Sequence, residues 1–375
     1  MPRPDLLVMA KPAGPRCNLR CDYCYYRDKD SLFPDGAQRM SEELLRLYIG
    51  ERLAASPGPV THFEWHGGEP TLMGLDFFAS VVRIQRTLRP PGRKITNGLQ
   101  TNGLLIDEEW ADFLSRQGFT VGLSLDGPAG LHDPFRAAAD GGGSHAQAVR
   151  AFRLLSSRQV VCNVLCVIHA ANALEPDSVY GFFRDLGARY VQFLPLVPSH
   201  GSAGAVQAAS VESIGSFLCR VFDLWIREGV GRIVVQSFDE ALRPIFGAPH
   251  SLCIHRETCG DVVVLEHDGS LYVCDHFVDK DHCLGILGER SMAEVGADPR
   301  LTEFGNAKRD SLPCACRQCD VLPSCNGGCP KDRTAEGLNV LCPAYKQFFL
   351  HVRPDLCRLS AHMKAGKSLQ SFCRA

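Results

Sequence analysis

Short runs of β-branched and aromatic residues alternate with longer segments of helical periodicity through roughly the first 200 residues. This alternation is typical of β/α units around a parallel sheet. Six units predict an α/β partial barrel, a (β/α)6 fold, whose chemistry lies on loops at the C-terminal ends of the strands. The predicted strands are residues 6–11, 62–66, 94–101, 120–125, 160–168 and 190–196.

The pattern also predicts helices and a change in architecture. A helix is expected at 41–54, with Ser41 as its N-cap and Glu43 in the first turn. A second helix is expected at 211–228 and a further strand at 232–237, after which the density of cysteines rises. We therefore predict two domains, residues 1–235 and 236–375.

Composition and charge exclude several classes of protein. A chain of 375 residues with 45% hydrophobic content can bury a large core or two domains. A net charge of -2, from 40 basic and 42 acidic residues, gives no reason to expect nucleic acid or an anionic membrane as partner. Without a secretion signal or a long apolar stretch, the expected location is the cytoplasm.

Eighteen cysteines in such a chain favour metal ligation over disulfides, because the cytosol is reducing. Three of them form the motif Cys17-x3-Cys21-x2-Cys24, directly after the first predicted strand. Three thiolates on one loop can ligate three irons of a cubane and leave the fourth iron open to a small molecule. The alternative is a zinc loop with a distant fourth ligand. The loop, with Tyr23 before its last cysteine, resembles the signature of the radical S-adenosylmethionine (SAM) superfamily.

This resemblance implies that SAM chelates the open iron and is cleaved to a 5′-deoxyadenosyl radical. Gly67-Gly68-Glu69-Pro70 resembles the family's GGEP motif, which holds the methionine amino group, although alone it could be an ordinary turn. Segments 100–103 and 124–127 resemble two further family motifs. The residues that the resemblance assigns to SAM or the substrate-facing site are Tyr23, Gly67, Gly68, Glu69, Asn102, Ser124, Asp126 and Arg136. Asn102 and Asp126 could instead be turn formers, and Tyr23, Tyr25 and Tyr26 could be core residues.

The C-terminal third carries Cys253-x5-Cys259-x14-Cys274 and Cys316-x2-Cys319-x5-Cys325-x3-Cys329-x12-Cys342. This spacing resembles the cysteine-rich SPASM domain, which holds two auxiliary 4Fe-4S clusters, so three clusters are expected. The resemblance assigns one cluster to Cys253, Cys259, Cys274 and Cys329, and the other to Cys316, Cys319, Cys325 and Cys342. Cys314 could replace one ligand, and two zinc sites would also fit the spacing. The other cysteines, Cys162, Cys166, Cys219, Cys283, Cys357 and Cys373, are expected to be buried or idle.

Segments 253–260 and 272–277 resemble the anaerobic sulfatase-maturating enzymes, which oxidise a cysteine or serine of a sulfatase to Cα-formylglycine (3-oxoalanine). The resemblance makes Asp275 the base that accepts a proton after hydrogen is abstracted from Cβ. The expected partners are an unfolded sulfatase with a Cys/Ser-x-Pro/Ala-x-Arg motif and an electron donor such as flavodoxin or ferredoxin. Asp275 could instead pair with a cation or cap a turn.

Two other functions remain open at this point. A SPASM enzyme that forms thioether or carbon–carbon crosslinks in a ribosomal peptide would share these cysteines. A protein that binds zinc or iron-sulfur clusters without catalysis, as a scaffold or electron carrier, would share them too. Cleavage of SAM would exclude the second alternative.

Overall fold

The chain folds into two compact units, each assembled from segments that are distant in sequence. The computed structural model describes residues 6–33, 39–197 and 208–372. Unit 1 comprises Met1–Ser124, Arg136–Cys162 and Gly260–Gly305, and unit 2 comprises Leu125–Phe135, Asn163–Cys259 and Asn306–Ala375. Because the units interleave along the chain, the domain boundary near residue 235 stays a prediction.

A mixed sheet forms the centre of unit 1, in the order β10-β9-β8-β1-β2-β3-β4. Its strands are β1 (Leu7–Lys11), β2 (Val60–Trp65), β3 (Lys94–Thr101), β4 (Phe119–Ser124), β8 (Val262–Glu266), β9 (Ser270–Tyr272) and β10 (Cys283–Ile286). β1 to β4 are parallel, and β8 pairs in parallel with β1 before the sheet turns antiparallel through β9 and β10. The C-terminal ends of β1, β2 and β3 therefore meet at one edge of the sheet.

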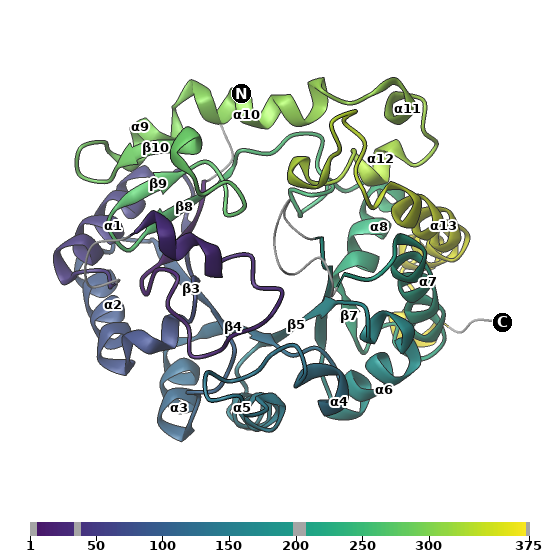
Figure 1. Ribbon diagram of the computed structural model, residues 1–375, viewed down its shortest axis with the longest axis horizontal. Helices are drawn as coiled ribbons and strands as arrows, with labels where there is room; N and C mark the ends of the chain where they lie inside the picture. Colours follow the sequence, from purple (N-terminus) through teal and green to yellow (C-terminus); the bar gives the residue numbers. More distant parts are fainter. Residues whose placement is uncertain (1–5, 34–38, 198–207, 373–375) are drawn as a thin grey trace. The chain divides into compact units, whose positions relative to one another are not determined.

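Helices of unit 1 cover the strands of this sheet, and Figure 1 shows α2 and α3 on the outer side of β3 and β4. The helical elements are α1 (Glu42–Ala55), α2 (Leu75–Leu88), α3 (Glu108–Gln117), α5 (His145–Ser157), α9 (Met292–Gly296) and the short 3-10 turns η1 (Arg27–Leu32), η2 (Pro70–Met73) and η5 (Lys280–His282). Ser41 caps α1 as predicted, since its hydroxyl accepts a hydrogen bond from the Leu44 amide at 3.1 Å. Trp65, fully buried at the end of β2, packs edge-on against Tyr48 of α1.

Unit 2 combines a short parallel sheet with a helical layer. Its strands, in the order β5-β6-β7, are β5 (Cys162–Ile168), β6 (Tyr190–Pro195) and β7 (Val234–Val235). Its helical elements are α4 (Ala129–His132), α6 (Pro176–Leu186), α7 (Val211–Glu228), α8 (Gln236–Phe246), α11 (Cys314–Arg317), α12 (Leu322–Cys325), α13 (Cys342–Lys364), η3 (Asn172–Leu174), η6 (Pro330–Asp332) and η7 (Leu369–Ser371). α13 packs along α7 and α8 (Figure 1). α10 (Pro299–Asp310) begins in unit 1 and ends in unit 2.

The six predicted strands and both predicted helices are confirmed to within two residues at each end. The strand predicted at 232–237 is wrong beyond Val235, because α8 begins at Gln236. Phe238 and Ala241 are buried three residues apart, which is helical spacing, and this face packs against α13. In the part of the chain that the structure describes, no helix combines the length and apolar character needed to span a bilayer.

Candidate active site and cysteine clusters

The loop that follows β1 carries the first three candidate ligands. The Leu19 amide lies 3.3 Å from the Cys17 Sγ, and the Asn102 side-chain amide lies 3.7 Å from the same sulfur. Desolvation raises the pKa of Cys17 to about 12, and the negative charges of Glu69, Cys21 and Cys24 add to this rise. Thiolates in such a group are unfavourable unless a cation binds them, so the loop fits a metal cluster.

The Gly-Gly-Glu-Pro segment is tied to the backbone of the cysteine loop. The Gly68 amide donates to the Gly14 carbonyl and the Glu69 amide to the Arg16 carbonyl, both at 2.8 Å. A Cβ on residue 68 would lie 2.1 Å from the Arg16 carbonyl oxygen, so only glycine allows this approach. The second strand's loop is therefore fixed beside the first strand's loop, at the C-terminal edge of the sheet.

Glu69 is buried, and its carboxylate accepts several hydrogen bonds. Oε1 accepts from the Thr71 amide and hydroxyl, at 3.0 and 2.6 Å, and from the Thr101 hydroxyl at 2.8 Å. Oε2 accepts from the Asn102 amide at 2.8 Å. Burial raises the pKa of Glu69, and these donors oppose the rise. A second lone pair on Oε2 is the acceptor that an ammonium group of a ligand could use.

The other unit 1 residues predicted to contact SAM or the substrate-facing site lie around the same edge. The Asn102 side-chain amide donates to the Asn18 side chain at 2.8 Å, and Arg136 donates to the Tyr23 hydroxyl at 2.9 Å. The Ser124 hydroxyl accepts from Gln100 at 3.2 Å. These contacts make Asn102 and Tyr23 part of the cysteine-loop surroundings.

Asp126 belongs to unit 2, where it is completely buried. Its Oδ1 accepts from the Val167 amide at 2.9 Å, and its own amide donates to the His132 ring at 3.1 Å. The Asn172 side chain also donates to the Asp126 carbonyl, at 3.3 Å. These contacts hold Asp126 against β5 and the segment that follows it, and its role toward SAM stays a prediction.

Asp275 lies in a group of charged and aromatic side chains within unit 1. Lys11 Nζ donates to Asp275 Oδ1, and the Tyr25 hydroxyl donates to Oδ2. Burial alone would raise the Asp275 pKa, but the charges of Lys11, His66 and His276 hold this pKa well below its usual range. Asp275 is therefore an ionised carboxylate that already has two donors.

Lys11 is the residue of this group that sequence reasoning missed. It is fully buried at the end of β1, its ammonium lies 3.9 Å from the centre of the Tyr26 ring, and its Nζ lies 3.5 Å from His66 Nδ1. The signal was a lysine closing an apolar strand, a position where a charge needs a buried partner. Tyr25 contacts Asp275 through its hydroxyl, and the Tyr26 ring lies against the Lys11 ammonium.

One of the two predicted C-terminal ligand sets lies wholly within unit 2. Burial raises the pKa of Cys325 to about 11, and the negative charges of Cys342, Cys316 and Cys319 raise it further. Cys316 is buried and interacts electrostatically with Cys342 and Cys319. Cys316, Cys319, Cys325 and Cys342 are therefore close enough to influence one another.

The other predicted set is divided between the units, with Cys274 in unit 1 and Cys253, Cys259 and Cys329 in unit 2. Burial raises the pKa of Cys329 to about 11, and Cys253 is among the charges that contribute. Over residues 6–33, 39–197 and 208–372, no three histidine, cysteine or acidic side chains converge as ligands of a single metal ion. A cubane does not require such convergence, because its four thiolates bind four different irons.

The remaining cysteines divide by environment. Cys162, Cys166 and Cys219 are buried, as expected of small apolar side chains. Cys283 is half-buried, Cys314 and Cys357 are exposed, and Cys373 lies outside the described residues.

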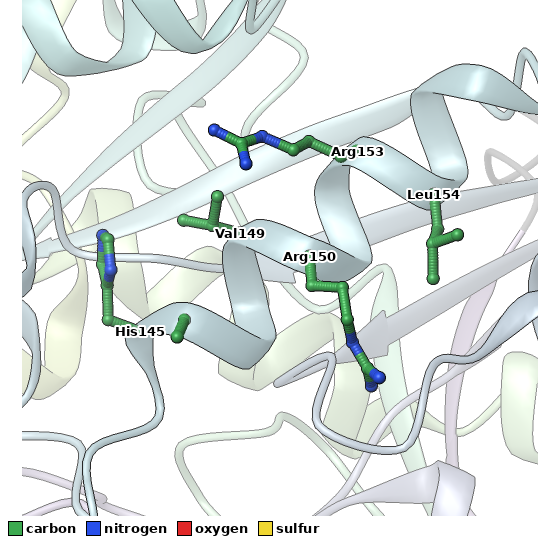
Figure 2. A pocket seen from close by; sticks show the side chains of 6 residues that line it. His145, Val149, Arg150, Arg153 and Leu154 are labelled. Carbon is green, nitrogen blue, oxygen red and sulfur yellow. The ribbon is translucent and has the colours of Figure 1, made fainter.

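A pocket of about 470 Å³ lies elsewhere in unit 1, on α5 (Figure 2). Its lining residues, His145, Ala146, Val149, Arg150, Arg153 and Leu154, all come from that helix. None of the candidate site residues lines it, so the chemistry is not expected there.

Two protein-family models match segments of the chain that carry candidate residues. The model of the radical SAM superfamily matches residues 12–179. The model of the SPASM iron-sulfur cluster-binding domain matches residues 253–320. The two matches contain the N-terminal cysteine loop, Asp275 and part of the C-terminal cysteines.

Individual relatives match over nearly the whole chain. The serine-type anaerobic sulfatase-maturating enzyme of Bacteroides thetaiotaomicron is 38% identical, over 93% of this chain and 90% of that enzyme. The cysteine-type enzyme of Clostridium perfringens is 33% identical, over 96% of this chain and 100% of that enzyme. The solved structure of native anSMEcpe with bound AdoMet and Cp18Cys peptide is 33% identical, with a TM-score of 0.87 over 96% of this chain and 100% of that chain.

Proposed function

Because the chain belongs to the anaerobic sulfatase-maturating enzymes of the radical SAM superfamily, we propose that it oxidises a cysteine or serine of a sulfatase to Cα-formylglycine. It is a radical SAM oxidoreductase with a partial (β/α)6 fold and a C-terminal SPASM domain. Its cofactors are SAM and 4Fe-4S clusters, one that binds SAM and two auxiliary. The observation that carries the catalytic assignment is the buried Asp275 carboxylate beside Cys274, with donors from Lys11 and Tyr25.

We assign the cofactors to residues by chemistry and surroundings. Cys17, Cys21 and Cys24 would hold the SAM-binding cluster, and Glu69 would receive the ammonium group of SAM at Oε2. The eight C-terminal cysteines would hold the auxiliary clusters in the two sets given above. When bound, SAM and its cluster supply the radical that removes a hydrogen atom from Cβ of the target residue.

Asp275 is proposed to accept the proton that the oxidised side chain releases. Reference pKa values near 3.9 for aspartate and 8.5 for a thiol already make direct deprotonation uphill by about 6 kcal/mol. Lys11 widens this difference, because it lowers the Asp275 pKa further. The proton can therefore move only when loss of the Cβ hydrogen has acidified the neighbouring S–H or O–H group.

Tyr25 places this proton acceptor near two thiol groups. Its hydroxyl donates to Asp275, and the negative charges of Cys24 and Cys274 both contribute to raising the Tyr25 pKa, after burial and Asp275 itself. Cys24 belongs to the proposed SAM-binding cluster and Cys274 to an auxiliary cluster. A proton acceptor and an electron acceptor would thus lie within one short segment, Cys274-Asp275.

The proposed substrate is an unfolded sulfatase polypeptide with a Cys/Ser-x-Pro/Ala-x-Arg motif. We further propose that flavodoxin or ferredoxin supplies electrons, and that neither nucleic acid nor membrane takes part, given the net charge of -2. The proposed location is the cytoplasm, where 18 cysteines stay reduced.

The test is an anaerobic reaction of reconstituted protein with SAM, dithionite and two peptides that differ only in cysteine or serine at the target position. We expect a mass loss of about 18 Da from the cysteine peptide or about 2 Da from the serine peptide, with about twelve irons per chain. Asp275→Asn should form 5′-deoxyadenosine and leave the peptide unchanged. A crosslinked peptide would instead indicate the crosslinking branch, and zinc in place of iron would refute the mechanism.

A further inference from the structure

Arg333 lies in unit 2, in the loop between Cys329 and Cys342, and only part of its guanidinium is bound by the protein. Its Nε donates to the Gly327 carbonyl at 3.3 Å, and its Nη1 donates to the Ser311 hydroxyl at 3.0 Å. Nη2 is buried and has no hydrogen-bond partner within the described ranges. A buried N–H group without a partner is costly, which points to a ligand at this position.

The surroundings of Arg333 indicate what this ligand is. Its guanidinium interacts electrostatically with cysteines of both proposed auxiliary sets: Cys316 and Cys325 of one set, and Cys259 and Cys329 of the other. All four lie in unit 2 together with Arg333. Arginine stays protonated in proteins, so a permanent positive charge stands near both sets of thiolates.

We propose that Arg333 donates a hydrogen bond through Nη2 to a sulfur atom of an auxiliary cluster and acts as one positive charge shared by both auxiliary clusters. This inference rests on the proposed function, because it needs the clusters to be present. Hydrogen bonds to sulfur and nearby positive charge both raise the reduction potential of an iron-sulfur centre. Arg333 would therefore make both auxiliary clusters better acceptors of the electron that leaves the substrate.

Lys308 is a buried cation of the same part of unit 2, and its contacts differ from those of Arg333 in a way that makes it a useful comparison. Its Nζ donates to the carbonyls of Cys253, Ile254 and Arg256, so its three N–H groups are used by the backbone. Its cysteine neighbours, Cys253, Cys259 and Cys329, all belong to one proposed set. Lys308 holds one ligand loop, whereas Arg333 has a free donor and neighbours from both sets.

The experiment measures the midpoint potentials of the auxiliary clusters by redox titration with electron paramagnetic resonance. It uses the full chain with Cys17, Cys21 and Cys24 replaced by alanine, so that only auxiliary clusters contribute signals. For Arg333→Gln we expect both potentials to fall, each by about tenfold in the reduction equilibrium, or about 59 mV for one electron. Arg333→Lys keeps the charge but loses the planar set of guanidinium N–H donors, so a smaller fall of both potentials is expected.

Arg317→Gln is the matched control, because Arg317 is an exposed arginine next to Cys316 whose Nε and Nη2 donate to the Leu312 and Asp310 carbonyls, at 2.9 and 3.0 Å. Solvent screens its charge, so both potentials should stay close to those of the parent. Lys308→Gln should change the midpoint potential of one auxiliary cluster at most.

Unchanged potentials in Arg333→Gln with full iron content would overturn the inference, and so would a shift of one cluster alone. If Arg333→Gln loses iron, the potentials of Arg333→Lys are the test. Auxiliary-cluster potentials in Arg333→Lys equal to those of the parent would refute the hydrogen bond. A parent that binds zinc would refute the proposed function itself, whereas iron-loaded protein with unaffected potentials would refute only the role of Arg333.

Discussion

Lys11 donates a hydrogen bond from its ammonium group to the Asp275 carboxylate, and both residues are buried in unit 1. The two residues are 264 positions apart, so the end of β1 and the turn after β9 meet through this pair. A buried carboxylate without a cation would take up a proton and lose its use as a base. The pair therefore links the stability of the site to its chemistry.

Lys11→Met is expected to reduce peptide oxidation by about 100-fold or more, the lower end of what a positioned base contributes. The pKa of Asp275 should rise once the ammonium is removed, because burial then dominates. A carboxylate that has taken up a proton can no longer accept one from the substrate. The measurement compares oxidised peptide with 5′-deoxyadenosine formed, and the latter should persist.

The control for Lys11→Met is the double variant Lys11→Met/Asp275→Asn. Breaking a buried pair leaves one charge uncompensated, whereas neutralising both partners is often close to neutral. The apparent melting temperature of the double variant should therefore exceed that of either single variant. A double variant whose melting temperature is no higher than those of the single variants would contradict the proposed coupling. Peptide oxidation by Lys11→Met at the parent rate would contradict it as well.

Gly68→Ala is expected to weaken SAM binding and to lower the free energy of unfolding by about 1–3 kcal/mol. The new Cβ would lie 2.1 Å from the Arg16 carbonyl oxygen, so the cysteine loop must move. Gly50→Ala is the control, because its Cβ would have ordinary contact with Leu88 at 3.8 Å, and alanine should stabilise α1 by about 0.5–1 kcal/mol. Equilibrium binding of SAM that matches the parent's would show that this close approach does not matter.

His66 should make folding less stable in acid. Burial and then Lys11 lower its pKa to about 4, with His276 acting in the same direction and Asp275 opposing. Between pH 6.5 and 4 the unfolded chain binds a proton at His66 that the folded chain does not. The contribution of His66 to the free energy of unfolding is therefore complete above pH 6.5 and is lost as the pH falls. The loss is at most about 3 kcal/mol, since each pH unit is worth about 1.4 kcal/mol.

The measurement for His66 is the apparent melting temperature at several pH values for the parent and for His66→Gln. Glutamine keeps a polar side chain and cannot titrate in this range. Its melting temperature should fall less between pH 6.5 and 4 than that of the parent. Parallel curves for the two proteins would show that His66 does not titrate as described.

Cys316→Ser and Cys314→Ser test which of two nearby cysteines is a cluster ligand. Cys316 is buried and interacts with Cys342 and Cys319, whereas Cys314 is exposed. Iron analysis after anaerobic reconstitution should fall from about twelve to about eight irons in Cys316→Ser and stay near twelve in Cys314→Ser. The reverse result would move the ligand assignment by two positions.

The sequence by itself determined the architecture and the kinds of chemistry. Six strands followed from runs of β-branched and aromatic residues, because the period of a half-buried strand is a local property. The cysteine loop was equally readable, since Cys17, Cys21 and Cys24 lie on one short loop. The local pattern predicted a strand at residues 236 and 237, but these residues begin α8, which packs against α13.

Only the tertiary structure decided which distant groups meet. It brought Lys11 to Asp275 and left Arg333 with a free donor near cysteines of two sets, and neither relation leaves a pattern in the chain. It also brought Asp126 to the backbone amide of Val167 and to the side-chain amide of Asn172. The physical reason is that pairing of buried charges depends on distances in space, whereas periodicity and motif spacing depend on distances along the chain.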